Sequence, residues 1–187
     1  MKVILGISNR HVHLNKEGFE KLFGKGHQLK SVKSLNQPNQ FVSDCKVSIK
    51  TNNGILNNVT VVGGLREYTQ IEISKTDALE LGINPPTRQS GDLENSEVVT
   101  LVGPIGEFTT VGCIIADRHI HITSEQKKAY GLNDTVNLLI NNEKNMILTD
   151  VHLKISDDAY YELHLDTDDA NNFELKNGDF LEIINTK

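Results

Sequence analysis

Apolar and polar residues alternate in short runs along most of this 187-residue chain. Alternation with a period of two is typical of a β-strand that buries one face. Pairs such as Asn53-Gly54 and Gly103-Pro104 mark turns between these runs. We therefore expect ten strands, at residues 2–7, 46–50, 59–62, 70–74, 97–102, 109–115, 135–140, 146–154, 161–165 and 179–184.

Helices are expected to be few and short, each beginning after a residue that can cap a helix N-terminus. Thr123 with Gln126 has the form of a capping box, and the helix that follows ends before Gly131. The other expected helices are residues 16–23 capped by Asn15, 77–81 capped by Thr76, and 168–173 capped by Thr167. Many short strands with few helices predict a mainly β protein built from small barrels or sandwiches.

One seven-residue stretch occurs twice. Residues 8–14 read Ser-Asn-Arg-His-Val-His-Leu, and residues 116–122 read Ala-Asp-Arg-His-Ile-His-Ile. Histidines at positions i and i+2 lie on the same side only in an extended strand, so each copy presents two imidazoles side by side. A cap and a short helix follow both copies. The repeat predicts two β-barrel-like units of similar build that meet at a shared site.

The paired histidines indicate a metal site, because neutral imidazole is the commonest protein ligand of zinc and similar metals. Catalytic zinc usually has three protein ligands and one exchangeable position. Glu72 and His164 lie in alternating segments and can complete two such sets, although such faces also commonly point to water. The predicted ligands are His11, His13 and Glu72 in one set, and His119, His121 and His164 in the other.

Alternation also sorts the neighbours of these histidines. Asn9 and Asp117 fall on the histidine face, and their side chains could accept the second ring N–H. Arg10 and Arg118 fall on the opposite face, where a salt bridge or a contact between barrels is expected.

The formal net charge of −6 argues against a nucleic-acid or membrane partner. No apolar run is long enough to cross a bilayer, and no signal segment precedes the first motif. Cys45 and Cys113 are isolated, so we expect two buried free thiols in a reducing cytoplasm. Only four of the 19 basic residues are arginine, the residue suited to bidentate recognition of an anion.

Over nearly its whole length the chain resembles the PduL-type phosphotransacylases, the phosphate propanoyltransferases. The two Arg-His-x-His copies occur in the family's order together with a Thr-Gln-x-Glu segment at 69–72 and a His-x-Asp-Thr-Asp segment at 164–168. Further matching stretches are 64–74, 90–93, 103–106 and 163–171.

The resemblance implies two β-barrel domains, residues 10–116 and residues 1–9 with 117–187, that share a dinuclear zinc site. It implies reversible transfer of a propanoyl or acetyl group between coenzyme A and inorganic phosphate. One zinc would be held by His11, His13 and Glu72 and would take the CoA sulfur, and the second by His119, His121 and His164. Arg66 matches the family arginine expected at the phosphate. We expect direct attack without an acyl-enzyme, since neither cysteine lies in a nucleophile motif.

Some features remain open. Cobalt and iron also accept this ligand set, the CoA-contacting residues are not assigned, and a homodimer is suggested by the resemblance alone. No proline precedes Arg66, and no N-terminal extension of the microcompartment-targeting type is seen, so a free cytoplasmic enzyme is expected. The alternative function is a cupin-like double-barrel metal-binding protein or oxygenase. Its motif places Glu shortly after the His pair, which the second copy lacks.

Overall fold

A computed structural model describes residues 1–141 and 144–184. The chain forms two compact units: unit 1 comprises Met1–Ser8 and Asp117–Lys187, and unit 2 comprises Asn9–Ala116. Each unit buries its own cluster of aliphatic side chains, centred on residues such as Leu138 in unit 1 and Ile71 in unit 2. Each unit therefore has the separate hydrophobic core expected of an independent domain.

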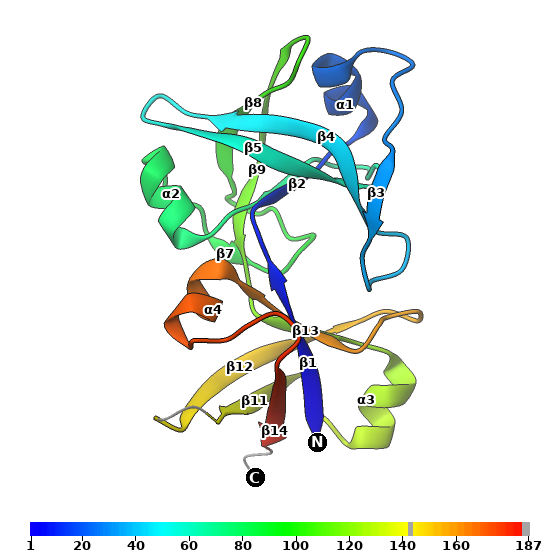
Figure 1. The fold of residues 1–187 in the computed structure, drawn as a ribbon, viewed down its shortest axis with the longest axis vertical. Coiled ribbons are helices and arrows are strands. Elements are labelled where there is room, and N and C mark those ends of the chain that lie inside the picture. The colour runs from blue at the N-terminus through cyan, green and yellow to red at the C-terminus, as the bar shows by residue number, and fades with distance from the viewer. Residues whose placement is uncertain (142–143, 185–187) are drawn as a thin grey trace. The chain divides into compact units, whose positions relative to one another are not determined.

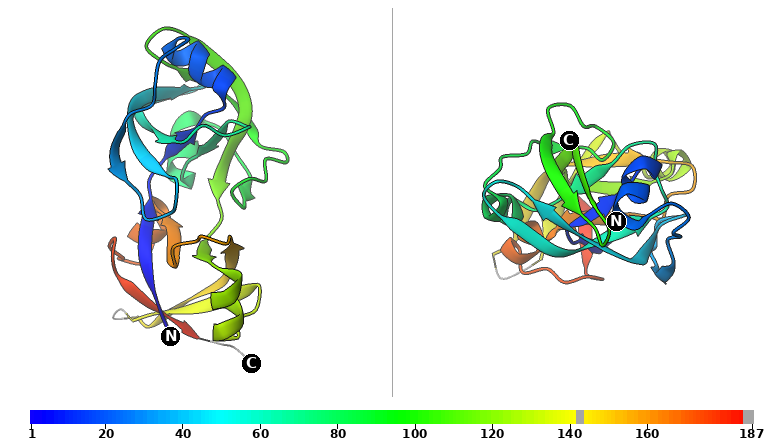
Figure 2. Two further views of the ribbon diagram at one scale, coloured as in Figure 1. Left: turned by 90° about the vertical axis from the view of Figure 1, so that its right-hand side faces the viewer. Right: turned by 90° about the horizontal axis from the view of Figure 1, so that it is seen from above.

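Unit 1 is a closed barrel of six strands in the order β1-β13-β10-β12-β11-β14. Its two short helices, α3 and α4, lie outside the ring of strands (Figures 1 and 2). Alternate residues of these strands face the core, as the burial of β11 shows. The strands are β1 (Lys2–Ser8), β10 (His119–Ile122), β11 (Thr135–Ile140), β12 (Met146–Ile155), β13 (Glu162–Asp166) and β14 (Phe180–Ile184).

Unit 2 contains a second ring of six strands, because β4 pairs with β5 and β8, β2 joins β5 to β6, and β9 joins β6 to β8. Strands β3 and β7 add to this ring at β4 and β9. The strands are β2 (His11–His13), β3 (Ser31–Ser34), β4 (Phe41–Lys50), β5 (Ile55–Gly63), β6 (Gln70–Glu72), β7 (Thr87–Arg88), β8 (Glu97–Val102) and β9 (Glu107–Ala116).

The mainly β fold with two barrels and a few short helices confirms the predicted fold class. Of the ten strands predicted with bounds, β8 and β11 have those bounds, and the other eight differ at one or both ends. The two histidine pairs, expected to be extended but given no strand bounds, form β2 and β10. Strands β3 and β7 were missed. All four residues of β3 are exposed and β7 has only two residues, so neither has the apolar alternation on which the prediction depends.

Two helices begin at their predicted caps. Helix α1 spans Lys16–Phe23 after Asn15, and α3 spans Ser124–Tyr130 after Thr123. The capping box predicted for α3 is present, with Gln126 accepting from the backbone N–H of the cap residue.

Helix α2 spans Lys75–Leu81, and the predicted cap Thr76 is wrong. The cap is Ser74, whose side chain accepts from the N–H of Asp77 while the Asp77 carboxylate accepts from the Ser74 N–H. This reciprocal pair satisfies two N–H groups at once, so it determines where the helix begins.

Helix α4 spans Thr167–Asn172, and the predicted cap Thr167 is its first helical residue instead. The cap is Asp166, which accepts from the N–H of Asp169. Burial raises the pKa of the Asp166 carboxyl, and these helix N–H bonds act in the opposite direction.

None of the helices in residues 1–141 and 144–184 is long and apolar enough to cross a membrane.

Candidate metal centres

The first ligand group lies in unit 2, where β2 and β6 run antiparallel. His11 is opposite Glu72 in the register. The Nε2 atoms of His11 and His13 are 3.2 Å apart, and the His11 Nε2 atom is 3.6 Å from Glu72 Oε2. One ligand atom from each of these three residues lies within 4.8 Å of the others. Both His13 and Glu72 are buried, so the face of β6 that carries Glu72 does not point to water.

The second group lies in unit 1 and is built in the same way from β10 and β13. His119 is opposite His164 in the antiparallel register. The Nε2 atoms of His119 and His121 are 3.2 Å apart, and the His164 ring centroid lies 4.6 Å from that of His121. The three imidazoles again bring ligand atoms within 4.8 Å of one another.

Both groups suit a divalent ion such as zinc. Two nitrogens bound to one tetrahedral zinc at their usual bond length lie about 3.3 Å apart, close to the 3.2 Å of each histidine pair. A carboxylate with two imidazoles, or three imidazoles, is a ligand set of catalytic zinc sites. Within each unit the structure thus brings together the three residues that the sequence suggested as one set of metal ligands.

Backbone carbonyl groups orient the first histidine of each pair. The Nδ1 atom of His11 is 2.8 Å from the carbonyl oxygen of Asn9, and that of His119 is 2.8 Å from the carbonyl oxygen of Asp117. This directs Nε2 of each ring toward its group, because a partner on one ring nitrogen fixes which nitrogen is free to bind a metal.

The prediction that the side chains of these two residues accept the ring N–H is wrong for His11 and His119, because the peptide oxygen two residues back is already in reach. The Asp117 carboxylate instead accepts from the Arg118 N–H and lies 3.1 Å from Nε2 of His152.

The sequence did not identify two side chains that support the third ligand of each group. Gln70 is opposite His13, and Glu162 is opposite His121, so they occupy equivalent register positions. The Gln70 amide donates to Oε1 of Glu72. Oε2 of the buried Glu162 lies 3.0 Å from Nε2 of His164. Only the strand register reveals these contacts, although each residue is two positions before the third ligand and so shares its face of the strand.

Arg10 and Arg118 form salt bridges, as expected for side chains on the face opposite the histidines. Arg10 pairs with Asp77, and Arg118 forms a bidentate pair with Asp169. Hydrogen bonding to Asp169 raises the pKa of Arg118. Each pair lies within a single unit, Arg10–Asp77 in unit 2 and Arg118–Asp169 in unit 1, so neither is a contact between barrels.

Arg66 differs from the other arginines of the chain. Arg10, Arg88 and Arg118 each lie within 4 Å of a carboxylate, but no carboxylate among residues 1–141 and 144–184 pairs with Arg66. Its backbone N–H donates to the carbonyl of Leu14, the residue after ligand His13, at 2.9 Å. The Arg66 guanidinium lies 6.0 Å from the ring centroid of Tyr68. The backbone of the half-buried Arg66 therefore lies beside the first ligand group, and no carboxylate in the described part of the chain pairs with its side chain.

The two cysteines are free and buried, as predicted. Burial raises the pKa of the Cys45 thiol to about 11 and that of Cys113 to about 12. Nucleophilic cysteines have lowered pKa values, so the structure gives neither thiol the properties of a catalytic group.

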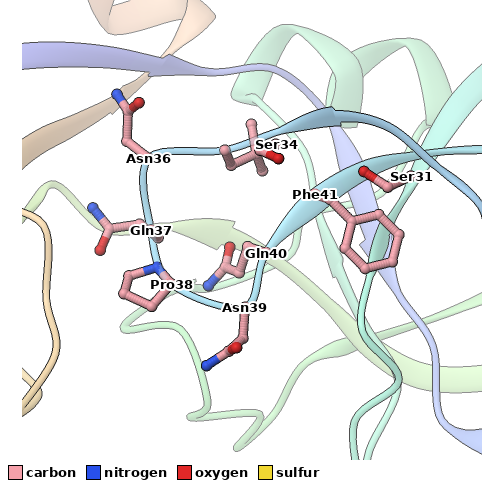
Figure 3. Close-up of a pocket in the computed structure, with 9 residues that line it drawn as sticks. Ser31, Ser34, Asn36, Gln37, Pro38, Asn39, Gln40 and Phe41 are labelled. Carbon is pink, nitrogen blue, oxygen red and sulfur yellow. The ribbon is translucent and has the colours of Figure 1, made fainter.

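A hollow of about 420 Å³ lies at the turn between β3 and β4, within unit 2 (Figure 3). Its labelled side chains are amides, hydroxyls, one proline and Phe41. No metal ligand and no ionisable residue lines it, so it is separate from the first ligand group.

Comparison with known proteins identifies the family. A family model described as phosphate propanoyltransferase matches residues 4–176. A phosphate propanoyltransferase of Thermotoga maritima is 42% identical over 186 residues, covering 97% of this chain and 89% of the relative. One of Shewanella putrefaciens is 44% identical over 171 residues, covering 89% and 81%, and one of Priestia megaterium is 41% identical over 180 residues, covering 95% and 83%. The chain therefore belongs to the phosphate propanoyltransferase family.

Proposed function

We propose that this protein reversibly transfers a short acyl group, propanoyl or acetyl, between coenzyme A and inorganic phosphate. Membership of the family supports phosphate acyltransferase activity with acyl-CoA and phosphate as substrates. The observation that carries the proposal is the combination in unit 2 of a three-ligand group with Arg66, an arginine that has no carboxylate partner among the described residues and starts beside that group.

Two zinc ions would be held, one by His11, His13 and Glu72 and the other by the three imidazoles of unit 1. When bound, zinc supplies a Lewis acid for the thioester carbonyl and a partner for the CoA thiolate. The chain itself orients the first histidine of each pair through the carbonyl groups of residues 9 and 117.

Arg66 would bind the phosphate dianion and direct one oxygen at the thioester carbonyl. A guanidinium can donate two parallel hydrogen bonds to phosphate, which fixes its orientation as well as its position. In the reaction, a phosphate oxygen forms a bond to the carbonyl carbon and the carbon–sulfur bond breaks. The acyl phosphate and CoA thiolate are the products, and the reverse reaction retraces these bonds.

Transfer would be direct, with no acyl group on the protein. The Cys45 and Cys113 thiols are buried and have raised pKa values, which makes both poor nucleophiles at neutral pH. Two free thiols also agree with a reducing compartment such as the cytoplasm. The cupin-like alternative shares the barrels and the metal ligands, but the family comparison favours acyl transfer.

The test is steady-state kinetics of CoA release from propanoyl-CoA and phosphate, with Arg66→Met as the variant. Loss of two charge-assisted hydrogen bonds, at about 1.5 kcal/mol each, predicts a roughly 100-fold higher KM for phosphate and little change in the KM for the thioester. Arg88→Met is the matched control, because the Arg88 side chain pairs with Asp92 and donates to the carbonyl oxygens of residues 87 and 94, none of which is a predicted metal ligand. Equal changes in both KM values for Arg66→Met would contradict the assigned role.

A further inference from the structure

The repeated arginine, which the proposed reaction does not use, makes the same contact in both units. In each unit it immediately precedes the first metal-ligand histidine, and it pairs with an aspartate five residues after the third ligand. These pairs are Arg10 with Asp77, five residues after Glu72, and Arg118 with Asp169, five residues after His164.

We propose that the Arg10–Asp77 and Arg118–Asp169 pairs are positioning pairs, each holding the third ligand of its own group against the histidine pair. This inference rests on the proposed metal groups. It assigns the arginines a role in metal affinity, one unit at a time, in place of a role at the substrate.

The pair in unit 1 has the geometry of a rigid connection. Arg118 Nε lies 2.7 Å from Asp169 Oδ2, and Arg118 Nη2 lies 2.6 Å from Asp169 Oδ1. A bidentate guanidinium–carboxylate pair fixes direction as well as distance. Asp169 is in turn held in the first turn of α4, where its N–H donates to Asp166 at 2.8 Å. Asp166 ends β13, two residues after His164.

The pair in unit 2 is also joined to a helix cap, here through one hydrogen bond from the arginine. Arg10 Nη1 bonds Asp77 Oδ1, and the other carboxylate oxygen of Asp77 accepts from the N–H of Ser74. Ser74 follows Glu72 by two residues and caps α2. The Asp77 side chain is only 9% exposed, against 42% for Arg10. Asp77 is therefore held by its own helix cap, and Arg10 is joined to that cap.

The ligands lie where the strand ladder is weakest. Strands β2 and β6 have three residues each, and β10 has four. The pairs His11–Glu72 and His119–His164 are the outermost paired positions of their ladders, and the chain leaves the pairing immediately before each histidine. Strand β13 is also paired with β1, and β6 with β9, but between the two ligand-bearing strands of each group no further rung lies beyond the ligand pair. The end of so short a ladder opens more readily than its middle. Each Arg–Asp pair joins the segment before the first histidine to the segment after the third ligand, at that open end of the ladder.

The alternation of side chains along a strand explains how the two arginines can hold the third ligands in place without contacting a metal. The arginine is one position from the histidine, so it projects to the opposite face, where the helix after the third ligand begins. The ligand face stays available for metal, and the opposite face carries the connection.

A general stabilising role predicts a different result. Partly exposed salt bridges contribute little to the free energy of unfolding, so loss of one would leave metal binding at both groups nearly unchanged. A positioning role predicts loss of affinity at one group only, by about the 10- to 100-fold that follows removal of residues that orient metal ligands.

The experiment measures cobalt binding and the visible cobalt spectrum of purified, metal-free protein. His119→Ala disables the group in unit 1 and leaves one site, in unit 2. In that background Arg10→Met should weaken cobalt binding about 10- to 100-fold, and Arg118→Met should leave it unchanged. In the His11→Ala background only the group in unit 1 remains, so Arg118→Met should weaken cobalt binding about 10- to 100-fold and Arg10→Met should leave it unchanged. Arg88→Met is the control for the charge change, and the conservative Arg10→Lys should recover part of the affinity.

Thermal unfolding of the metal-free variants separates a folding defect from a binding defect. If wild-type protein binds no cobalt, the metal groups themselves are wrong, and the positioning role fails with them. If wild type binds about two ions and both arginine variants bind like Arg88→Met in both backgrounds, only the positioning role is overturned. Equal weakening of both groups by either variant would also overturn it.

Discussion

Replacing Gln70 with alanine should weaken both the fold of unit 2 and its ligand group. The Gln70 side chain is fully buried and makes three hydrogen bonds. Its amide donates to the carboxylate of Glu72 and to the hydroxyl of Ser90 at 3.0 Å, and its oxygen accepts from the N–H of Gly91 at 2.8 Å. Hydrogen bonds between neutral groups contribute about 1 kcal/mol each, and one to a charged group about 1.5–3 kcal/mol. The variant should therefore lose about 3–5 kcal/mol of unfolding free energy, a large part of the usual 5–15 kcal/mol.

The assay is urea unfolding of metal-free protein, followed by measurement of cobalt affinity. Ser90→Ala is the matched control, since it removes only one of the three bonds and should lose about 1 kcal/mol. Gln70→Ala should also weaken binding at the group of Glu72 by about 10- to 100-fold, because the carboxylate loses the donor that orients it. A loss no larger than that of Ser90→Ala, with unchanged cobalt affinity, would refute this reasoning.

Three further changes test the local physics. The Tyr161 hydroxyl is buried with no hydrogen-bond partner among the described residues, and burial raises its pKa to about 12. Tyr161→Phe should therefore leave the free energy of unfolding in urea unchanged or raise it by about 1 kcal/mol, and a loss above about 1 kcal/mol would contradict this. With pKa values of about 11 and 12, Cys45 and Cys113 should react with a disulfide reagent at pH 8 at least about 100-fold more slowly than a free thiol, and readily in urea; rapid labelling of native protein would show that a thiol is accessible. Gly112 has φ +124°, and a Cβ there would lie 2.4 Å from a backbone carbonyl oxygen, so Gly112→Ala should lower the free energy of unfolding by about 3 kcal/mol or more. Gly178→Ala, at φ +92° with open space around it, should lower it by only about 1 kcal/mol, and equal losses would contradict the close approach at Gly112.

The alternation of apolar and polar residues predicted on which face of its own strand each candidate side chain lies. It placed His11 with His13 and His119 with His121 on common faces, and it placed both repeated arginines on the opposite face. It also predicted the mainly β fold, because strand period and turn residues are local properties. The exposed β3 strand carries no such signal and was missed.

Contacts that depend on strand register could not be predicted in this way. The support of Glu72 by Gln70 and of His164 by Glu162 appears only once β2 is paired with β6 and β10 with β13. The acceptors of the histidine Nδ1 atoms were assigned to side chains, because a sequence shows side-chain types but not the path of the backbone. The Arg118–Asp169 pair depends on where α4 begins, which is one residue earlier than predicted.

The most direct test of the central claim is metal-dependent acyl transfer. Purified protein should contain about two zinc ions per chain by elemental analysis, and it should form propanoyl-CoA from propanoyl phosphate and CoA. Removal of the metal with a chelator should abolish this activity, and added zinc should restore it, while His119→Ala should stay inactive after zinc is added. Full activity in metal-free protein, or in His119→Ala, would contradict the account.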